Sequence, residues 1–228
     1  MSNLEKNTVS AQAQVQNNVE IVQRGGTYKV LFVGNSITRH APKPEIGWFG
    51  DWGMAASAKN KDYVHLVVKH LEERLGAIDY AIVNCATWER QYYEKKPCEW
   101  ATARNFGADV IVVRLGENMW NAKDAFESHP IAPYFANLIA YFCANKAANV
   151  ILTDLFWKKE EIDREIRAVA QKKGYTFVSI NDLGDTEENM AIGQFEHTGV
   201  AMHPSDLGMQ RIAERITDSI LQVIDSKK

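Results

Sequence analysis

The stretch KVLFVGNSIT, residues 29–38, decides the fold of this chain. Its first six residues form an almost continuous apolar run, and glycine, asparagine and serine follow directly. A strand that is apolar on both faces is typical of a parallel sheet covered by helices on both sides, because an antiparallel sheet usually leaves alternate side chains in water. The polar residues after it then fall at the carboxyl end of the strand, where open α/β sheets bind ligands.

Four further runs of the same kind follow, separated by segments with helical spacing of apolar residues. The predicted strands are residues 29–34, 78–84, 109–115, 149–155 and 175–180. The predicted helices are residues 62–75, 99–106, 131–145, 158–173 and 205–224. Alternating strands and helices with right-handed crossovers predict an α/β protein, a three-layer α/β/α sandwich around a five-stranded parallel sheet.

Length and composition favour one enzyme-sized domain. The 228 residues suit a single α/β domain over residues 25–228, and the polar residues 1–24 are predicted to be a flexible tail. With 26 basic and 29 acidic residues the net charge is −3, and without a basic stripe we expect no nucleic-acid partner. No apolar run is long enough for a membrane span. Three cysteines without a CxxC pair suggest reduced thiols and a cytoplasmic protein, while the oligomeric state stays open.

Ser36 is the candidate nucleophile, because it lies two residues past the first strand at the expected functional edge. The position alone also fits a serine that caps a helix, or a loop that binds phosphate. A serine nucleophile needs a base, usually an imidazole. Of the six histidines, His203 precedes Pro204 and the start of the last helix, so its backbone sits at a rigid junction on the same edge.

Three short motifs, in this order along the chain, resemble those of the SGNH (GDSL-like) hydrolases. GNSIT at 34–38 is similar to the block usually written GDS, GEN at 116–118 to the block GxND, and HP at 203–204 to the last block. The resemblance implies a flavodoxin-like SGNH fold, with Ser36 as nucleophile, His203 as base and Asn118 in the oxyanion hole. It also implies a backbone N–H donor in the second block, usually a glycine after an asparagine. The matching stretch 84–87 has no glycine, and Ala86, or else Thr87, would offer that N–H.

The chain departs from that family at the third member of the triad. The family carries an aspartate three residues before the histidine, and this chain has Val200 there. Valine accepts no hydrogen bond through its side chain, so His203 needs another acceptor. We predict a backbone carbonyl within residues 196–201. Glu196 and Glu89 are the alternative acceptors.

These residues predict a serine-dependent carboxylic-ester hydrolase that needs neither metal nor organic cofactor. The partner would be a small-molecule or carbohydrate ester with a short acyl group, and carbohydrate O-deacetylation is one such reaction. A binding protein that kept the fold but lost turnover, and a thioesterase or acyltransferase using the same serine, are the alternatives.

Aromatic and polar residues near the predicted site are candidates for substrate binding, or else pack the loops onto the core. The candidates are Asn35, Trp48, Trp52, Trp88, Glu117 and Trp120. Arg114 ends an apolar strand, and its charge is expected to pair with Glu117 or Glu89.

Overall fold

The computed structural model describes residues 12–16 and 18–226, and among them the five predicted strands form one parallel sheet. The strand order is β1-β2-β4-β3-β5-β6-β7, of which β4, β3, β5, β6 and β7 are parallel. These five are Tyr28–Gly34 (β3), Ile78–Asn84 (β4), Val110–Arg114 (β5), Asn149–Thr153 (β6) and Thr176–Val178 (β7). The predicted mixed α/β sandwich is confirmed.

Two additional antiparallel strands correct the prediction of a tail. Gln12–Gln16 (β1) pairs with Val19–Gln23 (β2), and β2 pairs with β4 at the edge of the sheet. Val19 and Val22 are buried, so this hairpin contributes to the core. The polar composition hid the hairpin, since only one face of an edge strand need be apolar. The first eleven residues lie outside the described part of the chain.

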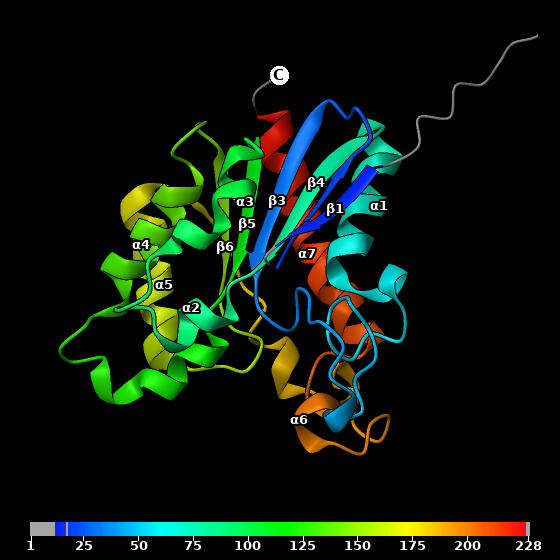
Figure 1. Cartoon of the computed structure of the whole chain (residues 1–228), viewed down its shortest axis with the longest axis vertical. Helices are drawn as coiled ribbons and strands as arrows, with labels where there is room; N and C mark the ends of the chain where they lie inside the picture. Colours follow the sequence, from blue (N-terminus) through cyan, green and yellow to red (C-terminus); the bar gives the residue numbers. More distant parts are fainter. Residues whose placement is uncertain (1–11, 17, 227–228) are drawn as a thin grey trace, which may run out of the picture.

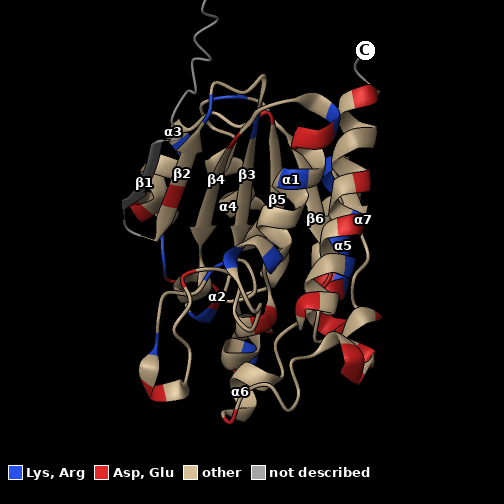
Figure 2. Cartoon of the chain, turned by 90° about the vertical axis from the view of Figure 1, so that its right-hand side faces the viewer, with Lys and Arg blue, Asp and Glu red and all other residues tan. Residues whose placement is uncertain are grey.

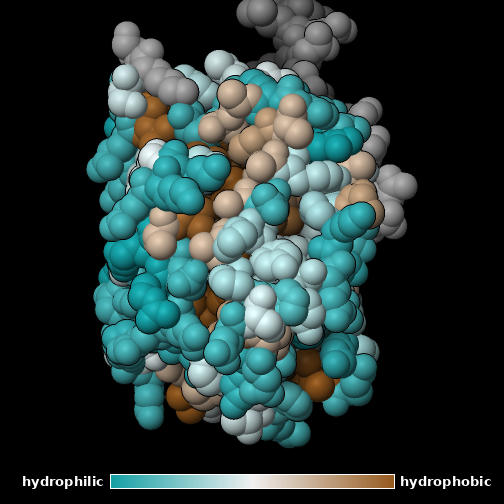
Figure 3. Space-filling view, turned by 90° about the vertical axis from the view of Figure 1, so that its left-hand side faces the viewer, coloured by the Kyte–Doolittle hydropathy of each residue, from teal (hydrophilic) through white to brown (hydrophobic). Residues whose placement is uncertain are grey.

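Helices cover both faces of the sheet (Figure 1). One side carries α1 (Tyr63–Leu75) and α7 (Asp206–Asp225), which contact each other. The opposite side carries α3 (Ala101–Asn105), α4 (Ile131–Phe142) and α5 (Glu160–Lys173). The outer surface of that second layer is mainly hydrophilic, with scattered apolar side chains (Figure 3).

Successive residues of β3 show why the strands read as continuous apolar runs. Leu31 and Val33 pack into the core under α3, α4 and α5, whereas Val30 and Phe32 pack into the core under α1 and α7. Each face of the strand is therefore buried against its own helix layer. None of the described helices has the length and apolar character needed to cross a membrane.

The register of the central strands brings the polar segments together. Gly34, the last residue of β3, is aligned with Asn84 at the end of β4 and with Arg114 at the end of β5. The short helices α2 (Ala86–Arg90) and α6 (Thr198–Ala201) lie at this same end of the molecule (Figures 1 and 2). Segments distant in sequence thus converge beyond the carboxyl ends of three neighbouring strands.

Candidate active site

The loop that carries the candidate nucleophile Ser36, residues 34–38, is called the nucleophile loop below. It leaves β3 through a tight turn that needs Gly34. A Cβ on Gly34 would lie 1.7 Å from Oγ1 of Thr38, so any other residue would displace the turn. The carbonyl oxygen of Asn35 accepts hydrogen bonds from the N–H groups of Thr38 and Arg39, both at 3.0 Å. The turn leaves Ser36 at its apex, with its carbonyl held by the N–H of Met54 at 2.8 Å.

His203 lies directly beside Ser36. The Ser36 Oγ and the His203 Nε2 are 2.8 Å apart, although 167 residues separate them in the chain. The backbone of His203 is fixed on both sides, because its N–H donates to the Val200 carbonyl and its carbonyl accepts from the N–H of Ala191, both at 2.9 Å. Ser205 then caps α7 through its hydroxyl, so the junction is as rigid as Pro204 implied.

The other imidazole nitrogen contacts a backbone carbonyl. His203 Nδ1 lies 2.7 Å from the carbonyl oxygen of Gly199, which lies within the predicted 196–201 segment. A carbonyl can only accept, so Nδ1 carries the hydrogen and Nε2 has a free lone pair toward Ser36. The predicted carbonyl acceptor is confirmed, and neither Glu196 nor Glu89 occupies this position.

Burial keeps the His203 imidazole neutral. His203 is only 9% exposed, and loss of solvation lowers its pKa to about 4, with the Gly199 hydrogen bond opposing the shift and the charges of Arg114 and His40 adding to it. Trp157 packs edge-on against the ring at a centroid distance of 5.0 Å. Sequence reasoning missed Trp157; its position four residues after β6, at the same sheet edge, was the available signal.

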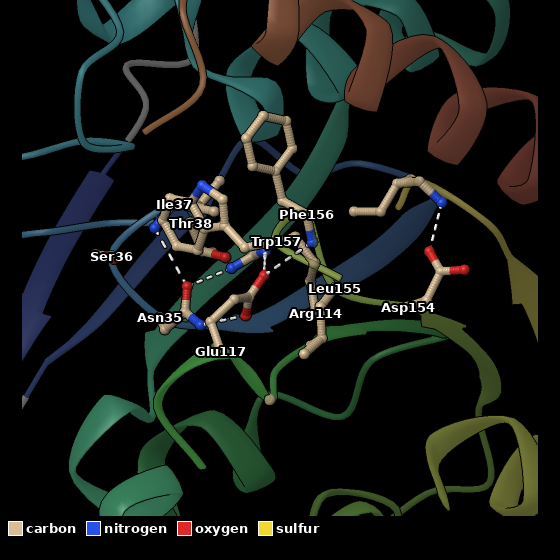
Figure 4. Close-up of polar contacts among 12 residues, drawn as sticks. Asn35, Ser36, Ile37, Thr38, Arg114, Glu117, Asp154, Leu155, Phe156 and Trp157 are labelled. Atoms are coloured by element: carbon tan, nitrogen blue, oxygen red, sulfur yellow. Dashed lines mark hydrogen bonds and ion pairs between the residues drawn. The ribbon is translucent and has the colours of Figure 1, made fainter. Parts of the chain in front are cut away.

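A buried polar network lies on the other side of the nucleophile loop. Arg114 is fully buried and pairs with Glu117, as predicted, and its guanidinium also donates to Oδ1 of Asn35. The Asn35 amide donates to Glu117 at 2.7 Å and to Glu89 at 3.0 Å. Figure 4 shows Asn35, Arg114 and Glu117 meeting beside Ser36. Both polar ends of the Asn35 side chain are thus used internally, which corrects its assignment to substrate binding.

Glu117 is likewise committed to the protein. Its side chain is only 4% exposed, and besides Arg114 and Asn35 it accepts from the N–H of Phe156 at 3.3 Å. Its expected pairing with Arg114 therefore replaces the predicted contact with substrate.

Asn118 follows the third strand and is held on both sides by α2. Its Nδ2 donates to Glu89 at 2.6 Å, and its Oδ1 accepts from Arg90 at 3.0 Å. Gly116 allows the chain to turn here, because its φ of 142° is a value that residues with a side chain rarely adopt. Asn118 is thus placed at the shared edge with one amide hydrogen left over.

Ala86 is less suited to the oxyanion role predicted for it. Its N–H donates to Oδ1 of Asn84 at 2.9 Å and therefore already has a partner. The N–H of Ser36, by contrast, has no acceptor among the described residues. Among the described residues, the N–H of Ser36 and the second amide hydrogen of Asn118 therefore remain without an acceptor, and Glu89 links the Asn118 amide to that of Asn35, the neighbour of Ser36.

The four tryptophans predicted to contact substrate differ in their burial. Trp88 and Trp48 are each only 2% exposed, and Trp88 packs against Tyr92 and Phe135 in the core, which excludes it from a substrate surface. Trp48 packs against Trp52, which is partly buried. Trp120 is 39% exposed, so it remains a candidate for substrate contact.

One exposed aromatic residue was not among the candidates. Phe49 is 73% exposed beside the buried Trp48. The candidates Trp48 and Trp52 indicated this region, but the sequence could not show which ring faces water. Among the described residues, no group of three or more His, Cys, Asp or Glu side chains is arranged to hold a metal ion.

No protein-family model matches the sequence, and no curated protein matches it either. Solved structures that match include the acetylxylan esterase Axe2 of Geobacillus stearothermophilus, which is 18% identical and superposes with a TM-score of 0.52 over 86% of this chain and 95% of its own. A variant of the same protein, described as an acetyl-xylooligosaccharide esterase, is 21% identical with a TM-score of 0.52 and the same coverage.

A catalytic mutant of this esterase in which a histidine is replaced by alanine is 21% identical, with a TM-score of 0.51 over 84% of this chain and 93% of that one. Catalytic mutants at a serine and at an aspartate match as well. The superpositions, with TM-scores of 0.51 and 0.52, show a common fold. The chain therefore has the α/β fold seen in these acetylxylan esterases.

Proposed function

We propose that this protein is a serine-dependent hydrolase of short-chain carboxylic esters, with O-acetylated carbohydrates as its substrate class. The observation that carries the proposal is the pair of contacts on His203, 2.8 Å to the Ser36 hydroxyl and 2.7 Å to the Gly199 carbonyl. An imidazole fixed in this tautomer can take the serine proton, which is the requirement for nucleophilic attack on an ester carbonyl.

The proposed reaction uses Ser36, His203 and Asn118. Ser36 attacks the carbonyl carbon while His203 Nε2 takes the hydroxyl proton. The oxyanion is stabilised by the Ser36 N–H and the free amide hydrogen of Asn118. His203 then protonates the leaving alcohol, which gives an acyl-enzyme that water hydrolyses by the same steps in reverse.

Turnover should be modest compared with that of an enzyme carrying a full triad. The imidazolium formed during attack is stabilised by a neutral carbonyl, which does so less well than a carboxylate. Burial is the main cause of the low pKa of His203, about 4. A pKa this low means that the site stabilises the protonated imidazole poorly. The geometry nevertheless keeps the base neutral and ready at pH 7.

The carbohydrate part of the proposal is supported by the structural neighbours and by an exposed aromatic ring. Acetylxylan esterases share the fold. Phe49, 73% exposed, offers a ring face of the kind that suits a sugar ring, whereas the ring of Trp120 already has the ammonium groups of Lys123 and Lys159 over it at 5.5 Å and 4.9 Å. No long exposed apolar strip of the kind a lipid-interface enzyme needs is evident in the loop that carries Phe49.

Hydrolysis assays with aryl acetates, acetylated xylo-oligosaccharides and octanoyl esters test the proposal. Wild type should hydrolyse aryl acetates and acetylated xylo-oligosaccharides, and it should prefer acetyl to octanoyl esters. Ser36→Ala should abolish both activities with an unchanged circular dichroism spectrum. Equal turnover by mutant and wild type would exclude Ser36 as nucleophile. Sugar binding without hydrolysis by wild type would favour a binding protein instead.

A further inference from the structure

Glu89 is a fully buried carboxylate on which three donors converge. Its Oε1 accepts from the N–H of Gly116 at 2.6 Å and from the amide of Asn35 at 3.0 Å, and its Oε2 accepts from the amide of Asn118 at 2.6 Å. Two of the donors follow β5 and the third follows β3. Glu89 therefore ties the segment that carries Asn118 to the nucleophile loop.

The contacts on Asn118 fix the orientation of its amide. A carboxylate can only accept and a guanidinium can only donate, so the contacts to Glu89 and Arg90 are compatible with a single orientation of the group. A flipped amide would put its oxygen against the carboxylate and its NH₂ against the guanidinium. Neighbouring residues of the short helix α2 thus hold both ends of one side chain.

We propose that Glu89 is a positioning residue, which orients the Asn118 amide so that its remaining hydrogen stabilises the oxyanion formed at Ser36. The inference rests on the proposed esterase function, because the oxyanion exists only in acyl transfer. Glu89 acts through Asn118 and does not contact the reacting atoms. Its role requires the ionised form, because a protonated oxygen would turn one of the acceptors into a donor.

The surroundings of Glu89 make that ionisation sensitive to pH. Burial and the neighbouring charge of Glu117 raise the pKa of Glu89 to about 7, against the hydrogen bonds from Gly116, Asn118 and Asn35. Glu117 has Arg114 as a direct partner, whereas Glu89 has no ion pair among the described residues. The other titratable neighbours are Arg90 on α2 and Cys85 at the start of that helix.

The sign of the pH effect separates Glu89 from the base. As pH falls through about 7, Glu89 takes up a proton and the Asn118 amide loses its acceptor. The imidazole of His203, with a pKa of about 4 because it is buried, remains neutral throughout that range. In a plot of kcat against pH, an acidic limb, a loss of activity as pH falls, with its midpoint near pH 7 thus reports protonation of Glu89. A limb near pH 4 reports protonation of His203.

The experiment measures kcat and kcat/KM for an aryl acetate over a pH range that runs from about one unit below the pKa of His203 to about two units above that of Glu89, with spontaneous hydrolysis subtracted. Wild type should lose activity with a midpoint near pH 7. Glu89→Gln should lower kcat about tenfold to a hundredfold at high pH, with less change in KM, and should lack this limb. Glu73→Gln, at an exposed carboxylate on α1 that pairs with Lys69, is the matched control and should retain the limb.

Asn118→Ala keeps the test decisive if Glu89→Gln fails to fold. Because Glu89 acts through Asn118, Asn118→Ala should also lose the limb near pH 7, and adding Glu89→Gln to it should change kcat little. A wild-type limb only near pH 4, or a limb near pH 7 that persists in Asn118→Ala, would overturn the inference. Ser36→Ala is run in parallel: if it retains turnover, the proposed function fails, whereas an inactive Ser36→Ala confines any failure to Glu89.

Discussion

The two sides of Ser36 are built from different kinds of group. On the His203 side the essential acceptor is neutral, the backbone carbonyl of Gly199. On the Asn118 side the structure buries two carboxylates, Glu89 and Glu117, and the Arg114 guanidinium. Two buried carboxylates and a buried guanidinium thus hold the amides of Asn35 and Asn118, whereas among the described residues no carboxylate accepts a hydrogen bond from the His203 imidazole. The contrast predicts that replacing the buried polar residues on the Asn118 side will lower kcat strongly. On the His203 side, only replacement of the imidazole itself should do so.

The largest effect should follow from removing the base. His203→Ala should reduce kcat for an aryl acetate about a thousandfold or more, because the His203 imidazole is the group that contacts the Ser36 hydroxyl and can take its proton. His197→Ala, an exposed histidine six residues earlier, is the matched control and should keep nearly full activity. A more severe loss in His197→Ala would mean that the base has been assigned to the wrong histidine.

A smaller loss is expected on the side of the buried charges. Asn118→Ala should lower kcat by about 10²–10³, the usual result of removing one oxyanion donor. KM should change little, because the donor acts mainly on the developing charge. Steady-state kinetics with acetyl esters measure both constants. A change confined to KM would assign Asn118 to ground-state substrate binding and remove it from the oxyanion hole.

The smallest effect tests the absence of a carboxylate on the histidine side. Glu196→Gln should leave kcat within a few-fold of wild type, because Gly199 already satisfies Nδ1 of His203. A loss on the order of 10³ or more would approach that of a neutralised triad acid. That outcome would identify Glu196 as the missing acid in the working enzyme and would erase the contrast between the two sides.

Most of the fold could be predicted because the apolar runs of the strands and the helical spacing of apolar residues are visible in the local sequence. The run at 29–34 and its four counterparts gave the parallel sheet, with boundaries that differ from the structure by a few residues. The β1–β2 hairpin could not be predicted in the same way. The Gln residues that alternate with Ala and Val in β1 resemble a polar segment until a neighbouring strand is known, and β4, the partner of β2, is remote in sequence.

The pairing of Ser36 with His203 could also be anticipated, because strand order places both at one edge. The carbonyl acceptor followed from Val200, whose side chain cannot take the place of an aspartate. The use of Asn35, Glu117 and Trp88 inside the protein could not be read from the sequence. Whether such residues face a substrate or one another depends on packing between segments such as α2 and the loop after β5, which no local pattern encodes.

Covalent labelling tests the central claim, a Ser36 hydroxyl activated by neutral His203, most directly. The protein is incubated at pH 7.5 (about three and a half units above the pKa of His203) with a fluorophosphonate, which reacts with activated serines, and the adduct is located by peptide mass spectrometry. The account predicts a single adduct on Ser36 in wild type and in Glu196→Gln, and a greatly slowed reaction in His203→Ala. Ester hydrolysis by a wild-type protein that is labelled at another residue, or equally fast labelling of His203→Ala, would contradict it.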